Sequence, residues 1–344
     1  MWTPHTGGQS QKKPRLPAFL SVPVVISAIF IVPLVLFLAW LSPLSVLLGF
    51  VPIFIVFPAL AWLDRVEPEP WSSRIHAVLW GAMVAALVSV IINSIVGLFS
   101  ETLAVVVSAP VVEETMKGLG VIWAVRRREV DGVMDGIVYA GWVALGFAVV
   151  EDFTFFVSAE DQGVLVQTFI LRATLTPFAH PLFTAWTGLA VGLAVSKQKP
   201  VLPYALWGLA LAIFTHFLWN GSIALTEATG QPLVILLAIA VFVLAFFAAM
   251  AAVIQIRRKD QKAFVAMIPF LAQRYGMAPN EVANFADWAH VRAVRAQLTK
   301  PQRKRFDEVH TALARLAHLH QRPGPINPAD EQVLFDQLQV ARSA

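Results

Sequence analysis

The chain has 344 residues, of which 57% are hydrophobic and 14% charged, and its mean hydropathy is +0.67. This composition excludes a soluble globular protein and indicates an all-α, polytopic membrane protein. The net charge is +4 and there are 0 cysteines, which excludes disulfides, thiolate nucleophiles and thiolate metal ligands. Any hydrolytic chemistry would have to come from Ser, Asp, Glu, His or a metal.

Hydropathy predicts about eight membrane-spanning helices after a short N-terminal segment, residues 1–16. A helix needs about 20 apolar residues to cross a bilayer. The first apolar stretch runs on to Trp40 without a small-residue cleavage site, which indicates a retained helix rather than a signal peptide. The sixth stretch contains Pro177 and Pro181, so we expect a short or broken helix before the crossing itself. The predicted spans are 17–40, 44–63, 75–99, 102–125, 133–157, 165–196, 201–225 and 232–256.

Lys and Arg gather in alternate loops, and this pattern predicts the orientation of the bundle. The remaining loops hold acidic residues and no Lys or Arg. Because cytoplasmic loops carry the excess of basic residues, we predict a multi-pass protein of a bacterial cell membrane with both termini in the cytoplasm. The basic loops lie at residues 12–15, 65–74, 126–128, 197–199 and 257–259.

The composition changes after Ile256, which divides the chain into a transmembrane domain, 17–256, and a basic cytoplasmic tail, 257–344. The tail holds 14 Lys and Arg against 8 Asp and Glu. Asn280 is predicted to cap an amphipathic helix that runs to Leu298, and Pro301 to open a second one. The second helix contains three histidines, which we interpret as a solvated helical face rather than a metal site: His310, His318 and His320.

Three charged side chains interrupt the apolar run from 102 to 125. They are Glu113, Glu114 and Lys117, in the stretch VVEETMKGLG. A carboxylate at bilayer depth costs a few kcal/mol, about 3 on insertion scales, so this group indicates a site. Lys117 follows Glu114 by three residues and Glu113 by four, and on a helix it can reach either carboxylate. With that partner, one glutamate can stay ionised and act as a base.

Further polar residues lie at similar depths in neighbouring predicted spans. Glu151 lies past the middle of the fifth, His180 in the sixth, and His216 and Asn220 in the seventh. The last two are four residues apart and share a helix face. An imidazole can bind a metal or move a proton, and an amide can donate to an oxyanion. Three carboxylates and two imidazoles exceed what helix packing requires, so we expect one functional cluster displaced toward the external face.

The sequence lacks the His-Glu-x-x-His, Gly-x-Gly-Asp and Gly-x-Ser-Gly signatures of other intramembrane proteolysis. It resembles instead the PrsW-type intramembrane protease family. EETMK at 113–117 matches the family's Glu-Glu-x-x-Lys motif, and FAVVE at 147–151 matches its Phe-x-x-x-Glu motif. DRVEPEPW at 64–71, the DGIVY segment and the region around His180 are also similar. A more distant likeness is to the CAAX prenyl endoprotease and bacteriocin-processing superfamily.

Two positions depart from the family's pattern. Its last motif is usually His-x-x-x-Asp, whereas His216 is followed by Asn220. The residue after the helical Glu is often Asn, whereas Asp152 follows Glu151 here. The Glu and His pattern itself is intact.

The resemblance implies a Glu/His-type endopeptidase that cleaves a membrane-anchored protein or peptide, such as site-one cleavage of an anti-sigma factor. Either Glu113 or Glu114 would activate water, and Lys117 would hold the pair ionised. Glu151 would orient a histidine or add a ligand, and Asn220 would steady the oxyanion. One divalent metal, with zinc favoured, would bind the following predicted ligands: His180, His216, Glu151 and Glu114.

Other interpretations stay open at this point. Water activated by Glu and His without a metal would need the same residues. A proton-coupled transporter also buries Glu, His, Arg and Lys, although no inverted repeat is evident in the sequence. A non-catalytic membrane scaffold is a third possibility. The bilayer is an expected partner and nucleic acid is not, and the sequence does not define the oligomeric state.

Overall fold

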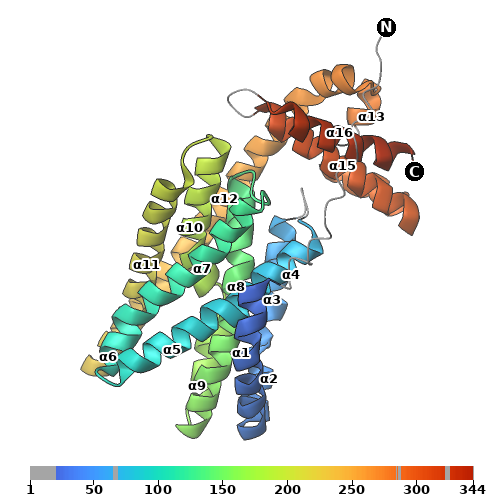
Figure 1. Cartoon of the computed structure of the whole chain (residues 1–344). Coiled ribbons are helices and arrows are strands. Elements are labelled where there is room, and N and C mark those ends of the chain that lie inside the picture. The colour runs from blue at the N-terminus through green and yellow to red at the C-terminus, as the bar shows by residue number, and fades with distance from the viewer. Residues whose placement is uncertain (1–20, 65–68, 284, 286–287, 322–325, 344) are drawn as a thin grey trace.

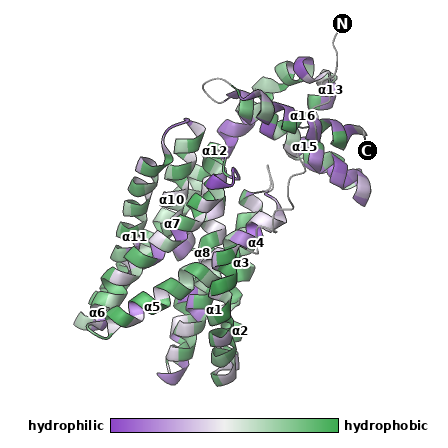
Figure 2. Ribbon diagram, in the orientation of Figure 1, coloured by the Kyte–Doolittle hydropathy of each residue, from purple (hydrophilic) through white to green (hydrophobic). Residues whose placement is uncertain are grey.

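The computed structural model describes residues 21–64, 69–283, 285, 288–321 and 326–343. Within these ranges the regular elements are helices and no strand occurs, which confirms the predicted all-α class. Figure 1 shows a bundle of long helices with a smaller group, α13 to α16, at one end. Figure 2 shows that hydrophobic residues dominate the bundle, whereas the smaller group is richer in hydrophilic residues.

The first two predicted spans form three helices: α1 (Val22–Leu41), α2 (Pro43–Gly49) and α3 (Val51–Leu63). The second span is interrupted after Gly49. The side-chain oxygen of Ser42 caps α2 by accepting a hydrogen bond from the backbone nitrogen of Ser45 at 3.4 Å. Each helix has a proline in its first turn, where the missing N–H needs no partner.

The third and fourth spans each contain a π-helical turn, labelled η. The third consists of α4 (Trp71–Leu79), η2 (Trp80–Ala85) and α5 (Ala86–Gly97). The fourth consists of α6 (Glu101–Leu103), η3 (Ala104–Ser108) and α7 (Ala109–Arg126). Such turns are rare and are frequent at functional sites.

Helix α8 (Val133–Asp161) is the central element, and most of its length is buried. It packs closely on α10 (Ala179–Ser196) through Gly136 and Gly188. A Cβ added at either glycine would lie 2.2 Å from the carbonyl oxygen of the other. Small residues at a helix interface let two backbones approach. This contact sets the spacing between the two helices that carry Glu151 and His180.

The sixth predicted span is broken, as expected from its prolines. It consists of α9 (Leu165–Phe169) and η4 (Ile170–Leu175), and α10 begins only at Ala179. Pro177 lies in the interruption. Helix α11 (Val201–Thr229) then follows α10 through a short connection and ends before Gly230, whose φ is +64°.

Seven helical segments within the described residues are long and apolar enough to cross a membrane. The remaining predicted span, α6 to α7, has a comparable length but carries Glu113, Glu114 and Lys117 at its centre. The polytopic helical architecture is therefore confirmed. In Figure 1 the α7–α8 and α10–α11 connections lie at the end of the bundle near α13 to α16, whereas α6 and α9 lie at the opposite end.

The cytoplasmic placement of both termini stays a prediction, and cysteine labelling tests it. Single cysteines introduced at Ser158 and Thr229 of this cysteine-free chain should react with an impermeant thiol reagent added outside intact cells, because both lie in the loops predicted to be external. Ser343→Cys should react only after lysis. Labelling of Ser343→Cys in intact cells would overturn this orientation.

The last predicted span continues well beyond its expected end at residue 256. Helix α12 runs unbroken from Pro232 to Tyr275 and comprises 44 residues, which corresponds to about 66 Å at 1.5 Å per residue. The residues after Ile256 are polar but favour helix. The helix ends where Gly276 adopts a left-handed conformation with φ +62°.

The C-terminal helices pack on the end of α12. They are α13 (Pro279–Ala283), α14 (Trp288–Gln297), α15 (Lys300–Gln321) and α16 (Pro328–Ser343). The prediction of a single helix after Asn280 is wrong, because that stretch is divided between α13 and α14. Helix α15 confirms the second predicted helix. Four leucines in this core are fully buried: Leu271, Leu313, Leu316 and Leu338.

The prediction of a solvated histidine face on α15 is also wrong. His310 is 8% exposed. His318 Nε2 lies 3.0 Å from the backbone oxygen of Asp131, and His320 Nε2 lies 3.2 Å from Glu331 Oε1. The sequence could not show that α16 and the α7–α8 connection cover this face.

His310 should make the C-terminal core acid-sensitive. Burial lowers the pKa of His310 to about 4 from its usual 6.5. The folded state therefore binds fewer protons than the unfolded state between these values, and stability present above pH 6.5 should be lost as the pH falls toward 4. In His310→Leu, hydrogen exchange of α15, corrected for intrinsic rates, should change less between pH 7 and 5 than in the parent. His290→Leu, at an exposed position on α14, is the control, and equal acid sensitivity of parent and His310→Leu would refute this role.

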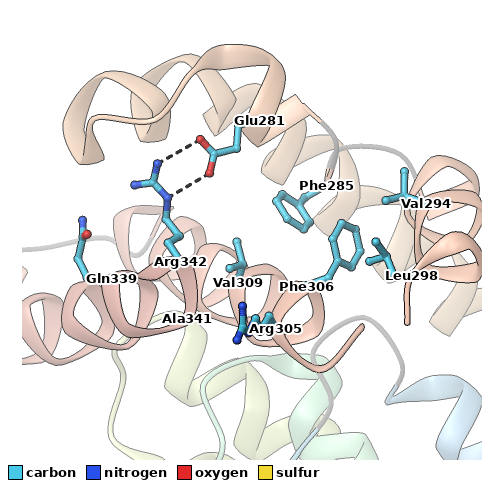
Figure 3. Close-up of a pocket in the computed structure, with 10 residues that line it drawn as sticks. All are labelled: Glu281, Phe285, Val294, Leu298, Arg305, Phe306, Val309, Gln339, Ala341 and Arg342. Carbon is cyan, nitrogen blue, oxygen red and sulfur yellow. Dashed lines mark hydrogen bonds and ion pairs between the residues drawn. The ribbon is translucent and has the colours of Figure 1, made fainter. Parts of the chain in front are cut away.

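A surface cavity of about 740 Å³ lies among the C-terminal helices (Figure 3). At its rim Arg342 donates to both carboxylate oxygens of Glu281, at 3.1 and 3.2 Å. Its lining belongs to this group of helices and includes no residue of the polar cluster in the bundle. The lining residues are Glu281, Phe285, Val294, Leu298, Arg305, Phe306, Val309, Gln339, Ala341 and Arg342.

The C-terminal helices touch the bundle at a buried carboxyl group, Glu69. Arg315 of α15 lies 4.0 Å from Glu69 Oε2, and the hydroxyl of Tyr139 on α8 donates to the same oxygen at 3.1 Å. Burial raises the pKa of Glu69 to about 8, against the opposing effect of Arg315. This contact connects α15 to the central helix of the bundle.

Candidate active site

Helix α7 buries Glu113, Glu114 and Lys117 completely or nearly so. Lys117 Nζ lies 2.7 Å from Glu114 Oε1 and 3.5 Å from Glu113 Oε2, as the spacing of three and four residues predicts. It also lies 3.0 Å from His180 Nδ1. The centroid of the Phe147 ring, on α8, lies 4.0 Å from Nζ, which is a cation–π contact.

Both carboxylate oxygens of Glu114 have partners in the cluster. Besides Lys117, its Oε1 lies 3.1 Å from Nδ1 of His216, and its Oε2 accepts a hydrogen bond from the hydroxyl of Thr184 at 2.8 Å. Thr184 was not among the predicted site residues. It follows His180 by four residues on α10 and therefore shares its face, a signal that could have found it.

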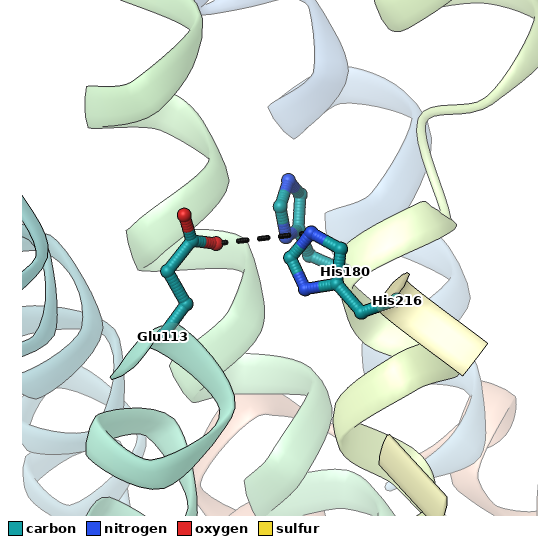
Figure 4. A group of neighbouring side chains, drawn as sticks. All are labelled: Glu113, His180 and His216. Atoms are coloured by element: carbon teal, nitrogen blue, oxygen red, sulfur yellow. Dashed lines mark ion pairs between the residues drawn. The ribbon is translucent and has the colours of Figure 1, made fainter. Parts of the chain in front are cut away.

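Glu113 forms a compact group with the two histidines. One ligand-type atom from each of Glu113, His180 and His216 lies within 4.8 Å of the others. The three side chains come from α7, α10 and α11 and point toward one another (Figure 4). His216 Nε2 lies 3.9 Å from Glu113 Oε2, and the two imidazole rings are 5.4 Å apart between centroids.

Glu151 contacts one of the two histidines, His180. Its Oε2 is 2.8 Å from His180 Nε2. The same oxygen accepts from the guanidinium of Arg172 on η4, which also donates to Asp152 Oδ1 at 2.6 Å. The structure thus brings Glu151 into the cluster through His180.

Asn220 makes its hydrogen bond outside this group. Its side-chain amide donates to the backbone oxygen of Val105, in η3, at 2.8 Å. The bond ties α11 to the segment that leads into α7. Six of the seven predicted catalytic residues are therefore linked by direct contacts, and Asn220 supports two of the helices that carry them.

The residues present fit a divalent cation. Two imidazoles and one carboxylate make up the donor set of many catalytic zinc sites. The Nδ1 atom of His216 faces the Glu114 carboxylate, and a metal-bound histidine commonly donates its second ring N–H to such a group. Among the predicted ligands, Glu114 and Glu151 contact one histidine each, whereas the carboxylate grouped with both is Glu113.

The charges of the cluster also favour a cation. Its carboxyl groups outnumber its cationic groups by two when all are ionised. Buried charge needs a compensating partner, and a divalent cation would supply it. The four carboxyl groups belong to Glu113, Glu114, Glu151 and Asp152, and the two cationic groups to Lys117 and Arg172.

Comparison with known proteins gives one family. Residues 69–252 match the model of a family described as PrsW family intramembrane metalloprotease. All seven predicted catalytic residues lie in this range. Protease PrsW of Clostridioides difficile (strain 630) is 31% identical over 160 residues, which cover 44% of this chain and 65% of that protein, less than two thirds of its length. Protease PrsW of Geobacillus kaustophilus (strain HTA426) is 30% identical over 175 residues, 48% of this chain and 74% of that protein. Solved structures give no significant match.

Proposed function

Because the chain belongs to the PrsW family of intramembrane metalloproteases, we propose that it hydrolyses a peptide bond of a membrane-anchored protein or peptide within or near the bilayer. The observation that carries this proposal is the convergence of Glu113, His180 and His216 inside the helical bundle. A scaffold would gain little from burying three such groups against one another.

Glu113, His180 and His216 would hold the divalent ion, and zinc suits this donor set. When bound, such an ion polarises the substrate carbonyl and makes water a stronger nucleophile. The ligands come from three helices, so the packing of α7, α10 and α11 fixes their relative positions. This rigidity favours a preorganised site.

Glu113 is proposed to hold the ion through one carboxylate oxygen and to accept the proton on the other. Its contacts with Lys117 and His216 both involve Oε2, which leaves Oε1 to take a proton from the attacking water. The water oxygen bonds to the carbonyl carbon, the C–N bond breaks, and the proton passes from Glu113 to the leaving nitrogen. The products are a new carboxyl group and a new amine.

The remaining predicted residues are proposed to position these groups. Glu114 would hold His216 through Nδ1, and Lys117 would keep the two glutamates in place. Glu151 would orient His180 through Nε2. For Asn220 we propose a positioning role in place of the oxyanion role, since its amide is bonded to the backbone of Val105.

The substrate would be a membrane protein that reaches the cluster from the bilayer of the bacterial cell membrane. The motif resemblance suggests site-one cleavage of an anti-sigma factor as one specific case. The exposed apolar surface of the bundle supports a lateral approach through lipid, as expected for intramembrane substrates.

A comparison of membrane proteomes tests the function. Cells that express the parent chain should contain membrane-protein fragments that are missing from cells with equal amounts of Glu114→Gln. Reconstituted parent protein should cleave the same protein in liposomes and should not conduct protons. Proton flux that depends on Glu114, with no cleavage, would favour the transporter interpretation instead.

A further inference from the structure

Arg172 makes a two-pronged contact with consecutive acidic residues of α8. Its Nε donates to Asp152 Oδ1 at 2.6 Å, and a terminal nitrogen donates to Glu151 Oε2. The ring of Phe155 lies 4.0 Å from the centre of the guanidinium. The planar guanidinium can serve two carboxylates in a fixed geometry, which an ammonium cannot. The position of Arg172 is thus constrained from three directions.

The carboxylate oxygen that Arg172 contacts also faces a histidine of the candidate metal centre. Glu151 Oε2 lies 2.8 Å from His180 Nε2, and the opposite ring nitrogen, Nδ1, lies 3.0 Å from Lys117 Nζ. Glu151 therefore takes Nε2, and Nδ1 is the nitrogen that would bind the ion, in place of its contact with Lys117. Any rotation of the Glu151 carboxylate would alter the contact on the Nε2 side.

Neighbouring residues on a helix point about 100° apart, so one side chain can contact both Glu151 and Asp152 only if it is long and forked. The guanidinium of Arg172 meets this requirement. The side chain of Asp152 is 5% exposed and that of Arg172 is 19% exposed, and such burial strengthens their interaction. Arg172 lies on η4, a π-helical turn that ends just before the break preceding α10. The turn brings the guanidinium to α8 while α10 carries His180 to the same place.

We propose that Arg172, together with Asp152, is a positioning residue that fixes the direction of the Glu151 carboxylate and thereby the orientation of His180 toward the ion. The proposal rests on the proposed function for its effect on hydrolysis, but its effect on ion binding can be measured separately. It assigns a purpose to Asp152, the acid at a position where the family motif often has Asn.

Zinc affinity of the purified, full-length protein provides the test, measured by competition with a chelator. Arg172→Met should bind Zn²⁺ about 10-fold more weakly, the low end of the range for lost partners of metal ligands, because Arg172 acts on His180 through Glu151. Arg172→Lys keeps the positive charge but lacks the forked guanidinium, so its Zn²⁺ affinity should lie between those of Arg172→Met and the parent. Asp152→Asn should lose less than Arg172→Met, because an amide oxygen can still accept from Nε.

A double variant separates positioning from simple packing. If Arg172 acts through Glu151, adding Arg172→Met to Glu151→Gln should weaken Zn²⁺ binding less than about threefold further, since coupled residues are not additive. Arg257→Met is the matched control, because this arginine donates to the backbone of Trp62 away from the cluster. It should change thermal stability at most and leave zinc affinity unaltered.

The outcomes distinguish this inference from the proposed function. Two results with a Zn²⁺-binding parent would overturn the positioning role alone. One is that Arg172→Met binds Zn²⁺ as tightly as the parent. The other is that the double variant loses affinity by the full product of the losses in Arg172→Met and Glu151→Gln. A parent protein that binds no Zn²⁺ would overturn the zinc site and the positioning role, and the proteome comparison would then decide whether the chain still hydrolyses peptides. Should Arg172→Met fail to fold, Arg172→Lys with and without Glu151→Gln carries the same comparison.

Discussion

Glu113→Gln is expected to reduce the rate of peptide hydrolysis by at least about 100-fold, the usual contribution of a general base. The amide keeps the shape of the side chain but cannot take a proton from water. Glu114→Gln should produce a loss of similar size for a different reason, because it removes the negative charge that balances Lys117 and replaces one of the two oxygens that contact His216 and Thr184 with an NH₂ group. Lys117→Met should also lower the rate by releasing both glutamates. Turnover of a substrate found by the proteome comparison, at matched protein amounts, is the measurement.

Glu160→Gln is the control for this series. Glu160 lies near the end of α8, where the hydroxyl of Ser45 donates to it at 2.6 Å, and it belongs to the same bundle but not to the cluster. Its variant should retain parental turnover. Parental rates in all three cluster variants would contradict the hydrolase mechanism, whereas a loss in Glu160→Gln would point to general damage to the bundle.

Removing both imidazoles should remove the metal. Purified parent protein is expected to carry close to one equivalent of a divalent ion, with zinc favoured, and His180→Ala combined with His216→Ala should carry almost none, because only one of the three proposed ligands remains. Elemental analysis of the purified proteins gives the metal content. The double variant should also be inactive.

His318→Ala combined with His320→Ala removes two histidines from the C-terminal helices and is the matched control, which should retain its metal. Dialysis of the parent against a strong chelator should abolish hydrolysis, and added Zn²⁺ should restore it. A metal-free preparation that remains fully active would exclude the metal and leave water activation by Glu and His.

The sequence predicted the helical spans well because their apolar lengths are a direct consequence of bilayer thickness. It also predicted the contacts of Lys117, since partners three and four residues apart are fixed by one helix. The grouping of Glu113 with His180 and His216 could not be predicted in the same way. It depends on how α7, α10 and α11 pack, and no short-range spacing within the sequence reports that packing.

The structure also differs from other expectations. The last predicted span was expected to end at residue 256, where the sequence becomes polar, but these polar residues favour helix, and α12 continues to Tyr275. The histidines of α15 looked exposed because their partners, such as Asp131 and Glu331, lie far away in the sequence. The oxyanion role predicted for Asn220 stays a prediction; in the structure its amide donates to the backbone oxygen of Val105, in another helix.

Because α12 is unbroken, the bundle and the C-terminal helices are coupled in rotation about its axis. Each residue of a helix advances it by about 100° and 1.5 Å, so one residue inserted between Arg257 and Lys262 would turn the C-terminal helices by more than a quarter revolution. Arg315 would then face away from Glu69, and His318 away from Asp131. An insertion of seven residues would nearly restore the angle but move these helices about 10 Å along the axis. The contacts between the C-terminal helices and the bundle therefore constrain both the length of α12 and the rotation about its axis.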